Sequence, residues 1–359
     1  MYHLLPASLI GLLFCGVSGF ELVSKPTKLD INASSFIENV PTFFDLSDLH
    51  LVKVEHAFDS YWAGGIVRTT SNDNYLLMAH AAVYGNVTTY RGGILSLDDP
   101  LGYHPKYYQA VNTFTHNNGT VEPFHLTIPG NVFDMELIGP ANEWFPRLKI
   151  TSRVPETKFN IAIDMDKAGP PVLNAGLGSW LWVGEPQHQV SVPRGRLSGT
   201  FTVNDTLFTI DPSQSLGWYD RQWGPTLAPA FTWLGLYLTS SNTSHEEIYA
   251  SIWNWEDDVN GNKSFATIQR PSGINTIVPL ADFTVTDSFQ SPVSNKTYSL
   301  DHRIRLADGT LLHIKPVRRD QEFVMQGFDN PFYSGAVEVT GNQYTGYGYI
   351  DILPGGGSF

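Results

Sequence analysis

The chain has 359 residues, of which 42% are hydrophobic and only 16% are charged. This length is enough for two domains of ordinary size, each with a sizeable core. The formal net charge of -13 repels phosphate backbones, and no long run of Lys or Arg offsets it, so we exclude nucleic acid as a partner.

The N-terminal segment 4–19 is almost wholly apolar and ends in a Val-Ser-Gly triplet of small residues. Its apolar run is shorter than the roughly 20 residues that a transmembrane helix needs. We therefore predict a secretory signal peptide over residues 1–19, a secreted protein, and no stable membrane insertion. The only cysteine, Cys15, lies in this segment, so the mature chain is expected to have no disulfide and no cysteine-metal site.

Asn-x-Ser/Thr sequons occur along the whole chain, and several of them stand among Gly and Asn in turn-like contexts. They support entry into the secretory pathway, and any of them that carries a glycan is expected on an exposed loop. The acceptor asparagines are Asn32, Asn86, Asn118, Asn204, Asn242, Asn262 and Asn295.

The segment 217–224 places an Asp and an Arg side by side among large aromatic residues. Trp218, Tyr219 and Trp223 each bury roughly 150 Å² or more when they pack, whereas Asp and Arg are seldom fully buried unless they are paired. This mixture is difficult to explain as solvated surface. It predicts a polar pair, Asp220 and Arg221, held in an apolar wall.

After a proline-bounded stretch from Pro225 to Pro229, the hydrophobic pattern has a period of two. Segments 231–238, 248–253 and 298–306 are predicted strands, and Asp308-Gly309 is a favoured hairpin turn. Long amphipathic stretches with helix caps are nearly absent. The fold class is therefore predicted to be all-β and mostly antiparallel, in barrels or sandwiches that close their edges.

The stretch after residue 225 also predicts a domain boundary. It would separate a larger β domain over 20–225 from a barrel of roughly eight strands over 226–359, a number that can enclose one small ligand. The Asp-Arg run would then lie near the junction, and domain interfaces are preferred places for ligand pockets.

Searches for cofactor motifs find none. The sequence has no phosphate-binding loop, no Gly-x-Ser-x-Gly elbow and no His-Glu-x-x-His. Its 11 histidines are scattered without the spacing of a zinc site. We predict no cofactor and no metal.

The run Gly217-Trp218-Tyr219-Asp220-Arg221-Gln222-Trp223-Gly224 resembles the signature of the hydroxyneurosporene synthase and kievitone hydratase-like family. Tyr61-Trp62 followed by segment 75–81 is similar to its N-terminal pattern, and segment 346–351 to its closing strand, so the resemblance covers most of the mature chain. Bacterial members carry His before the Asp, where this chain has Tyr219. A role of that histidine cannot be transferred.

The resemblance implies two lipocalin-like antiparallel β domains, a sandwich or open barrel followed by a barrel of about eight strands. It also implies a hydrophobic pocket between them that takes a small-molecule substrate and needs no cofactor. The fungal secreted members that it most resembles are hetero-Diels-Alderases. They dehydrate a hydroxylated polyketide, of tropolone or phenol type, to a quinone methide and join this to a terpenoid alkene. Hydration or dehydration of a prenylated or polyene substrate is the alternative.

Either reaction needs proton transfer, and Asp220 is the candidate for it because a carboxyl group in an apolar site can be tuned as acid or base. Arg221 could fix that carboxylate or hydrogen-bond a substrate carbonyl, and Tyr219 is the third catalytic candidate. The expected pocket residues are Trp62, His80, Trp218, Trp223, Trp233 and Tyr349.

Strand geometry raises an objection to this set. Neighbouring residues of a regular strand point to opposite faces, so only one of Asp220 and Arg221 can face the pocket unless a bulge intervenes. The two could instead be a structural ion pair. His80 could equally be a satisfied core histidine, and Trp233 a core aromatic.

Two other classes of protein stay open. A lipocalin-like carrier would have the same barrel and apolar pocket without chemistry. A secreted glycosidase would need carboxylates that converge in space, and the adjacent pairs 246–247 and 257–258 are more typical of solvated charge. The substrate and the oligomeric state are not determined by the sequence.

Overall fold

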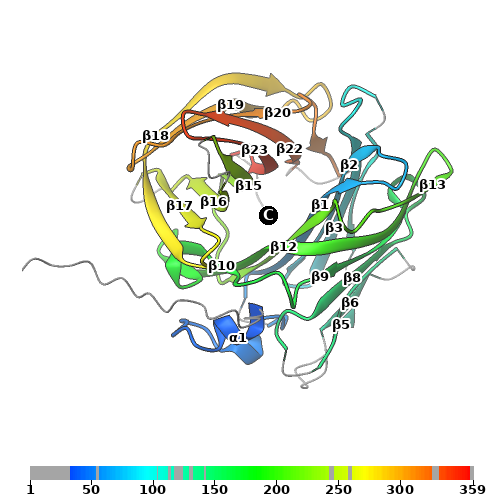
Figure 1. Ribbon diagram of the computed structural model, residues 1–359, viewed down its shortest axis with the longest axis horizontal. Coiled ribbons are helices and arrows are strands. Elements are labelled where there is room, and N and C mark those ends of the chain that lie inside the picture. The colour runs from blue at the N-terminus through cyan, green and yellow to red at the C-terminus, as the bar shows by residue number, and fades with distance from the viewer. Residues whose placement is uncertain are drawn as a thin grey trace, which may run out of the picture.

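The computed structural model describes residues 33–53, 56–102, 104–111, 115–116, 124–128, 132–140, 143–241, 246–257, 261–325 and 331–355. Strands make up most of these ranges, which confirms the all-β prediction (Figure 1). The predicted signal peptide with its cysteine lies outside them. The helical elements are short: α1 (Ala33–Ile37), η1 (Leu46–Asp48), η2 (Pro155–Thr157) and η3 (Asn174–Gly176). No helix in the described ranges is long and apolar enough to cross a membrane.

The first sheet contains 14 antiparallel strands. Its main path runs β4-β3-β2-β1-β14-β12-β9-β8-β7-β6-β5, with the three remaining strands paired to β12. The strand that carries the Asp-Arg run, β14, therefore lies inside the sheet between β1 and β12. The strands are β1 (Phe58–Arg68), β2 (Asn74–Tyr84), β3 (Val87–Ser96), β4 (Lys106–Val111), β5 (Thr115–His116), β6 (His125–Ile128), β7 (Phe133–Ile138), β8 (Arg147–Ser152), β9 (Phe159–Asp164), β10 (Val172–Leu173), β11 (Ser179–Trp182), β12 (Glu185–Val203), β13 (Thr206–Thr209) and β14 (Leu216–Gly224).

The second sheet has 9 strands and closes on itself, because β20 pairs with β22. With β21 left at the side, the closed part is a barrel of 8 strands, as predicted. The β19–β20 hairpin turns at Asp308-Gly309, where the glycine has a φ of 90°. The strands are β15 (Phe231–Ser240), β16 (Glu247–Trp255), β17 (Lys263–Gln269), β18 (Asn275–Gln290), β19 (Thr297–Leu306), β20 (Leu311–Pro316), β21 (Glu322–Phe323), β22 (Phe332–Gly341) and β23 (Tyr344–Leu353).

The change from one sheet to the other falls between Gly224 and Phe231. The domain boundary that we predict at 225 lies inside this connection. The predicted strands 231–238, 248–253 and 298–306 correspond to β15, β16 and β19, so the period-two pattern located them correctly.

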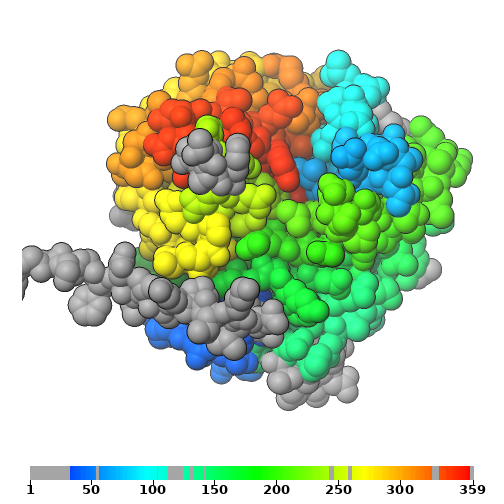
Figure 2. All heavy atoms as spheres, in the orientation of Figure 1, coloured from blue at the N-terminus to red at the C-terminus, as the bar shows by residue number. Residues whose placement is uncertain are grey.

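Three apolar clusters hold the fold together. The barrel is filled by its own aliphatic side chains, among them Leu236, Ile252 and Ile304, and a second cluster covers one face of the first sheet. The third is mostly aromatic and joins residues of both sheets, for example Trp62 and Trp233. Figure 2 shows the orange and red barrel strands packed along the blue and green first sheet. Because the barrel interior is filled, a ligand site is expected between the sheets rather than inside the barrel.

Four of the sequons fall in the described ranges, and their asparagines are exposed: Asn86, Asn204, Asn262 and Asn295. Asn204 and Asn295 also have positive φ, which is typical of turns. The other three, Asn32, Asn118 and Asn242, lie outside the described residues. Exposure at these positions is compatible with glycans, whose presence stays a prediction.

Candidate functional site

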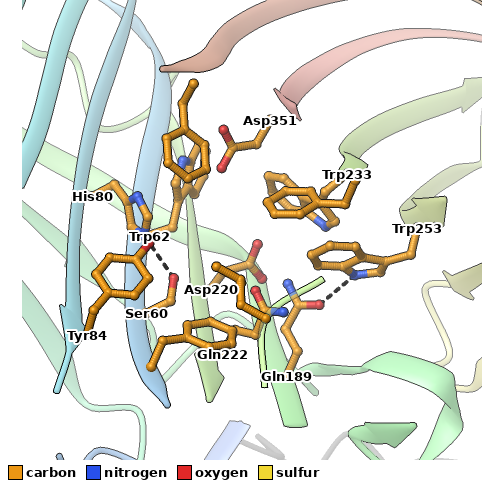
Figure 3. Close-up of a pocket in the computed structure, with 14 residues that line it drawn as sticks. Ser60, Trp62, His80, Tyr84, Gln189, Asp220, Gln222, Trp233, Trp253 and Asp351 are labelled. Atoms are coloured by element: carbon orange, nitrogen blue, oxygen red, sulfur yellow. Dashed lines mark hydrogen bonds between the residues drawn. The ribbon is translucent and has the colours of Figure 1, made fainter. Parts of the chain in front are cut away.

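A pocket lies between the two sheets, at the place that the Asp-Arg run occupies (Figure 3). The cavity volume is about 30 Å³. The first sheet contributes Phe58, Ser60, Trp62, His80, Tyr84, Gln189, Asp220 and Gln222; the connection and the second sheet contribute Leu227, Phe231, Trp233, Trp253, Phe332 and Asp351. The walls are mainly aromatic, with a few polar groups that converge on the space between them, as in small-molecule sites generally.

Strand β14 is regular where it passes the pocket. Its register with β1 is unbroken from Phe58 opposite Gly224 to Ile66 opposite Leu216, and the nearby irregularity lies in β12 instead. Alternate residues of β14 therefore face opposite sides. Asp220 lines the pocket, while Arg221 points to the other side of the sheet. The objection from strand alternation is confirmed, and the two residues are not an ion pair.

The Asp220 carboxyl group is buried in the pocket wall, with 4% of the residue exposed. None of the described residues makes a regular hydrogen bond to its Oδ1 atom. Burial raises the pKa of Asp220 to about 7, although the polar groups of Ser191, Trp218 and Gln189 act to lower it. A carboxyl group with a pKa near neutrality can both donate and accept a proton at physiological pH.

Arg221 belongs to the structural framework, which corrects its prediction as a catalytic residue. Its guanidinium forms a buried salt bridge with Asp59 and donates to the carbonyls of Leu49 at 2.6 Å and Leu51 at 2.9 Å. It also lies over the ring of Tyr61, 4.3 Å from the centroid. These contacts fasten the segment before β1 onto the sheet and leave no atom of Arg221 for a substrate.

Tyr219 and Trp223 face the same side as Arg221, so their prediction as catalytic and pocket residues is corrected too. The Tyr219 hydroxyl is 3.1 Å from Nδ1 of buried His50, and both Tyr219 and Trp223 belong to the apolar cluster of the first sheet. Trp223 packs on Phe44, with ring centroids 4.9 Å apart. The reason is the strand period: one step along β14 places these side chains on the face away from the barrel.

The predicted aromatic wall is present in part, because Trp218 and Tyr349 pack against it without lining the pocket. Trp62 and Trp233 line the pocket, with ring centroids 5.3 Å apart. Trp218 and Tyr349 stand behind them, Trp218 at 6.0 Å from Trp233 and Tyr349 at 4.9 Å from Trp62. Trp253 is a third indole in the lining, and its Nε1 donates to Oε1 of Gln189 across the two sheets at 2.7 Å.

Two glycines make room for these indole rings. A Cβ atom on Gly64 would lie 2.4 Å from the ring of Trp62, and one on Gly235 would lie 2.8 Å from the ring of Trp233. In both cases the glycine follows the tryptophan by two residues on the same strand face. The ring can therefore lie flat on its own strand instead of projecting into the pocket.

His80 lies in the pocket lining and is the first member of a buried polar network. Its Nε2 is 2.9 Å from Oγ of Ser60, and its Nδ1 accepts a hydrogen bond from Nε of Arg91 at 3.0 Å. Arg91 then pairs in bidentate fashion with Asp351 of β23, with both N–O distances at 3.0 Å. Asp351 also accepts from the Ser334 hydroxyl. The network joins the two sheets through side chains that are all buried.

Burial is the main cause that holds the pKa of His80 well below its ordinary value, and the Arg91 charge acts in the same direction. His80 is therefore a neutral imidazole at physiological pH. The sequence analysis identified His80 but missed Ser60 and Arg91 as parts of its network. A signal for Arg91 was present, since it is a single cation inside the apolar strand β3.

No group of three or more His, Asp or Glu side chains that could hold a metal ion occurs in the part of the chain that the structure describes. Of the carboxylates weighed for a glycosidase, Glu246, Glu247 and Asp257 do not line the pocket, and Asp258 lies outside the described residues. The chemistry that the described pocket residues can support is therefore proton transfer.

Comparisons with known proteins agree with the fold. Two curated fungal relatives are similar over nearly the whole chain. A dehydratase of Emericella nidulans, asqC, is 26% identical and is matched over 88% of this chain and 89% of its own. Kievitone hydratase of Fusarium solani subsp. phaseoli is 23% identical, over 88% of this chain and 87% of its own. Both names denote the removal or addition of water, which supports an enzyme of lyase type.

Solved structures share the architecture. The crystal structure of kievitone hydratase from Nectria haematococca superposes with a TM-score of 0.76, at 24% identity, over 88% of this chain and 94% of that one. A putative AttH protein from Nitrosomonas europaea gives a TM-score of 0.62 at 13% identity, over 87% and 97% of the two chains. The AttH-like family model matches residues 110–355. The chain belongs to the AttH-like family, in agreement with the resemblance seen in the segment 217–224.

Proposed function

We propose that this protein is a dehydratase or hydratase that removes water from, or adds it to, a hydrophobic small molecule in the pocket between its sheets. The observation that carries the proposal is Asp220, a buried carboxyl group with a pKa of about 7 in an aromatic wall. The two enzyme relatives support the same class of reaction.

Asp220 is the group that moves the proton. In the dehydration direction, its O–H protonates the substrate hydroxyl, the C–O bond breaks and water leaves. The substrate then loses a proton from a neighbouring C–H or phenolic O–H to the Asp220 carboxylate, which restores the acid. Hydration is the reverse sequence, with the carboxyl group protonating the alkene and the carboxylate accepting a proton from the attacking water.

The surroundings of Asp220 favour this cycle. A raised pKa keeps a large fraction of the group protonated near neutrality, and the negative charge of Asp351 contributes to that rise. The aromatic rings of Trp62, Trp233 and Trp253 keep bulk water away from the reacting carbon. They also present π faces, which stabilise a cationic or quinone-methide-like intermediate.

The finer proposal is that the dehydrated product is captured by an alkene in a stereoselective hetero-Diels-Alder reaction. Such a step needs little from protein side chains beyond positioning two π systems at near-attack distance, an effect of about 7–11 kcal/mol at most. The layered indoles of the pocket favour it, because their flat faces can stack a planar diene. It predicts a single enantiomer of the adduct.

The direct test is Asp220→Asn, with Asp59→Asn as matched control. Both carboxyl groups are buried in neighbouring strands, but only Asp220 faces the pocket. The substrates are kievitone, named by one relative, and a panel of prenylated phenols that carry a benzylic or allylic alcohol. Mass spectrometry in isotopically labelled water follows the gain or loss of one water. We expect Asp220→Asn to lower kcat by about 10²–10⁴-fold, and Asp59→Asn to retain kcat while folded.

The outcomes separate the classes of function. Equal kcat for Asp220→Asn and the native protein would exclude Asp220 as the proton-transfer group. Tight binding of the panel without any exchange of water would identify a carrier instead. Adding a terpenoid alkene to the dehydration assay tests the cycloaddition, which is rejected if the adduct is racemic or forms equally without protein.

A further inference from the structure

We propose that the Ser60 hydroxyl is a substrate-binding hydrogen-bond donor that recognises an acceptor oxygen, and that His80 and Arg91 are the positioning residues that fix its direction. The inference follows from the order of hydrogen bonds in the buried network. It rests on the proposed function only for the statement that the ligand is the substrate.

Arg91 determines which groups of the network donate hydrogen bonds and which accept them. A guanidinium can only donate hydrogen bonds, and Nε of Arg91 donates to Nδ1 of His80 at 3.0 Å. The Nδ1 atom must therefore carry the lone pair. Arg91 cannot turn away, because Asp351 holds it by two hydrogen bonds and the ring of Phe332 lies 4.1 Å from its central carbon.

The tautomer of His80 follows from this. A neutral imidazole with a lone pair on Nδ1 carries its proton on Nε2, and Nε2 is the atom 2.9 Å from Ser60 Oγ. His80 therefore donates to Ser60. It cannot act as the base that activates a serine nucleophile, because its only lone pair is engaged by Arg91.

Ser60 is left with a free hydroxyl hydrogen. His80 is the one side chain in the described ranges that hydrogen-bonds its Oγ atom, and Ser60 lines the pocket. Successive N–H and O–H dipoles of the network all point from Arg91 toward the pocket, and each polarises the next. The Ser60 hydroxyl, at the pocket end of this network, is therefore a strengthened donor for an acceptor oxygen.

The position of Ser60 relative to Asp220 restricts the class of ligand. Ser60 and Trp62 lie on the same face of β1, and Asp220 is the cross-strand partner of Trp62 on β14. Diagonal neighbours of this kind are about 7–8 Å apart. One substrate can therefore reach both groups, with a carbonyl or phenolic oxygen on Ser60 and the reacting alcohol or alkene carbon near Asp220. The ligand class is an aromatic or conjugated ketone or phenol, not a plain hydrocarbon polyene.

Binding of two inert probes tests this without any catalysis. Benzophenone carries a carbonyl where diphenylmethane has a methylene group, and the two are otherwise alike. Quenching of the pocket tryptophans reports the dissociation constant of each. We expect the native protein to prefer the ketone, and Ser60→Ala to weaken ketone binding by about 5- to 10-fold while leaving diphenylmethane unchanged.

Further variants separate direction from packing. Ser60→Thr keeps the hydroxyl and is expected to keep the preference for the ketone. His80→Gln can accept from Arg91 and donate to Ser60, so it is expected to retain most of the preference for the ketone. His80→Leu should weaken ketone binding by about 3-fold, because the Ser60 hydroxyl is then free to rotate. Ser152→Ala, a buried serine of β8 outside the pocket, is the control and should change neither constant.

The proposal is overturned if the native protein shows no preference for the ketone, if Ser60→Ala affects both probes equally or neither, or if His80→Leu behaves like His80→Gln. Its failure is distinct from that of the proposed function. Loss of the ketone preference in Ser60→Ala would stand even if Asp220→Asn had full activity, and the reverse result would leave Asp220 as the acid with a different group binding the substrate oxygen.

Discussion

The two faces of β14 surround a buried charged group in different ways. On the face away from the barrel, Arg221 has a carboxylate partner in Asp59, carbonyl acceptors and an aromatic ring on either side. On the pocket face, none of the described residues forms an ion pair with Asp220 or a hydrogen bond to its Oδ1 atom. A fully satisfied charge contributes to the framework, and an unsatisfied one is available for chemistry.

The comparison also explains why the two faces tolerate these groups. Arg221 lies where the segment before β1 supplies backbone carbonyls, so its desolvation is offset by hydrogen bonds. Asp220 escapes the cost of a buried charge in another way, since its pKa of about 7 allows it to remain neutral. The hydrogen-bonded Arg221 makes the framework rigid, whereas the neutral Asp220 is a group that can exchange protons.

Removing Arg221 is expected to have the largest effect on stability. Arg221→Met removes the guanidinium from the buried Asp59 carboxylate, which keeps only the contact with His56 among its ion pairs, and releases the carbonyls of Leu49 and Leu51. The free energy of unfolding should fall by about 3–5 kcal/mol, as measured by urea denaturation. The control is Arg319→Met, which breaks an exposed ion pair with Asp287 and should cost less than about 1 kcal/mol. Similar losses for both variants would contradict the contrast between buried and exposed pairs.

Removing the charge of Asp220 should raise the free energy of unfolding at neutral and higher pH, in contrast to the loss expected for Arg221→Met. The folded protein holds the pKa at about 7 against an ordinary 3.8, so it binds the proton more tightly than the unfolded chain. Stability from this group is thus full below pH 4 and declines as the pH rises from there to 7. At about 1.4 kcal/mol for each of roughly 3 pH units, the loss approaches about 4 kcal/mol.

Asp220→Asn should abolish this decline and so be more stable than the native protein at pH 8. Urea denaturation of both proteins at pH 5 and pH 8 measures the difference. A native protein whose stability does not fall relative to Asp220→Asn between these values would show that Asp220 is not held neutral by its surroundings.

The pH dependence of kcat/KM tests the same contrast between the two faces of β14, with a smaller expected effect. Dehydration needs the protonated form of Asp220, so kcat/KM is expected to be level in mild acid and to fall as the pH rises through about 7. The decline should approach tenfold for each pH unit. The native enzyme and Arg221→Met should share this midpoint, since Arg221 lies on the other face. A midpoint that moves with Arg221 would mean that the two faces are coupled.

The smallest expected effect belongs to Tyr219, the position where the family pattern changes. Tyr219→Phe removes the hydrogen bond to His50, which spans 3.1 Å, and should lower stability by about 1 kcal/mol. Because the ring faces away from the pocket, kcat and KM should not change. A fall in kcat at constant stability would restore Tyr219 as a catalytic residue.

The sequence predicted the architecture better than the site. Period-two segments located β15, β16 and β19, and the domain boundary after residue 225 stays a prediction. Of the predicted pocket residues, Trp62, His80 and Trp233 line the pocket, as does the catalytic candidate Asp220, whereas Trp218 and Tyr349 are not in the lining. Arg221 and Trp223 do not, because membership of a motif says nothing about the face on which a side chain lies.

The network residues that are absent from the predicted site were missed for one physical reason. Ser60, Arg91 and Asp351 come from β1, β3 and β23, which are brought together by sheet pairing and by packing of the barrel on the first sheet. Their contacts span up to 260 positions in the chain. Single polar residues in apolar strands were visible in the sequence, but their partners were not.

The sequence by itself determined the all-β class, and it predicted that Asp220 and Arg221 point in opposite directions if their strand is regular, because strand alternation is a local property of the backbone. The tertiary structure alone decided which of the two faces the pocket and which is paired. That choice depends on what covers each face of β14: the segment before β1 covers one, and the aromatic side of the barrel covers the other. Burial and partners, which set the charge state of each group, exist only once those distant segments have packed.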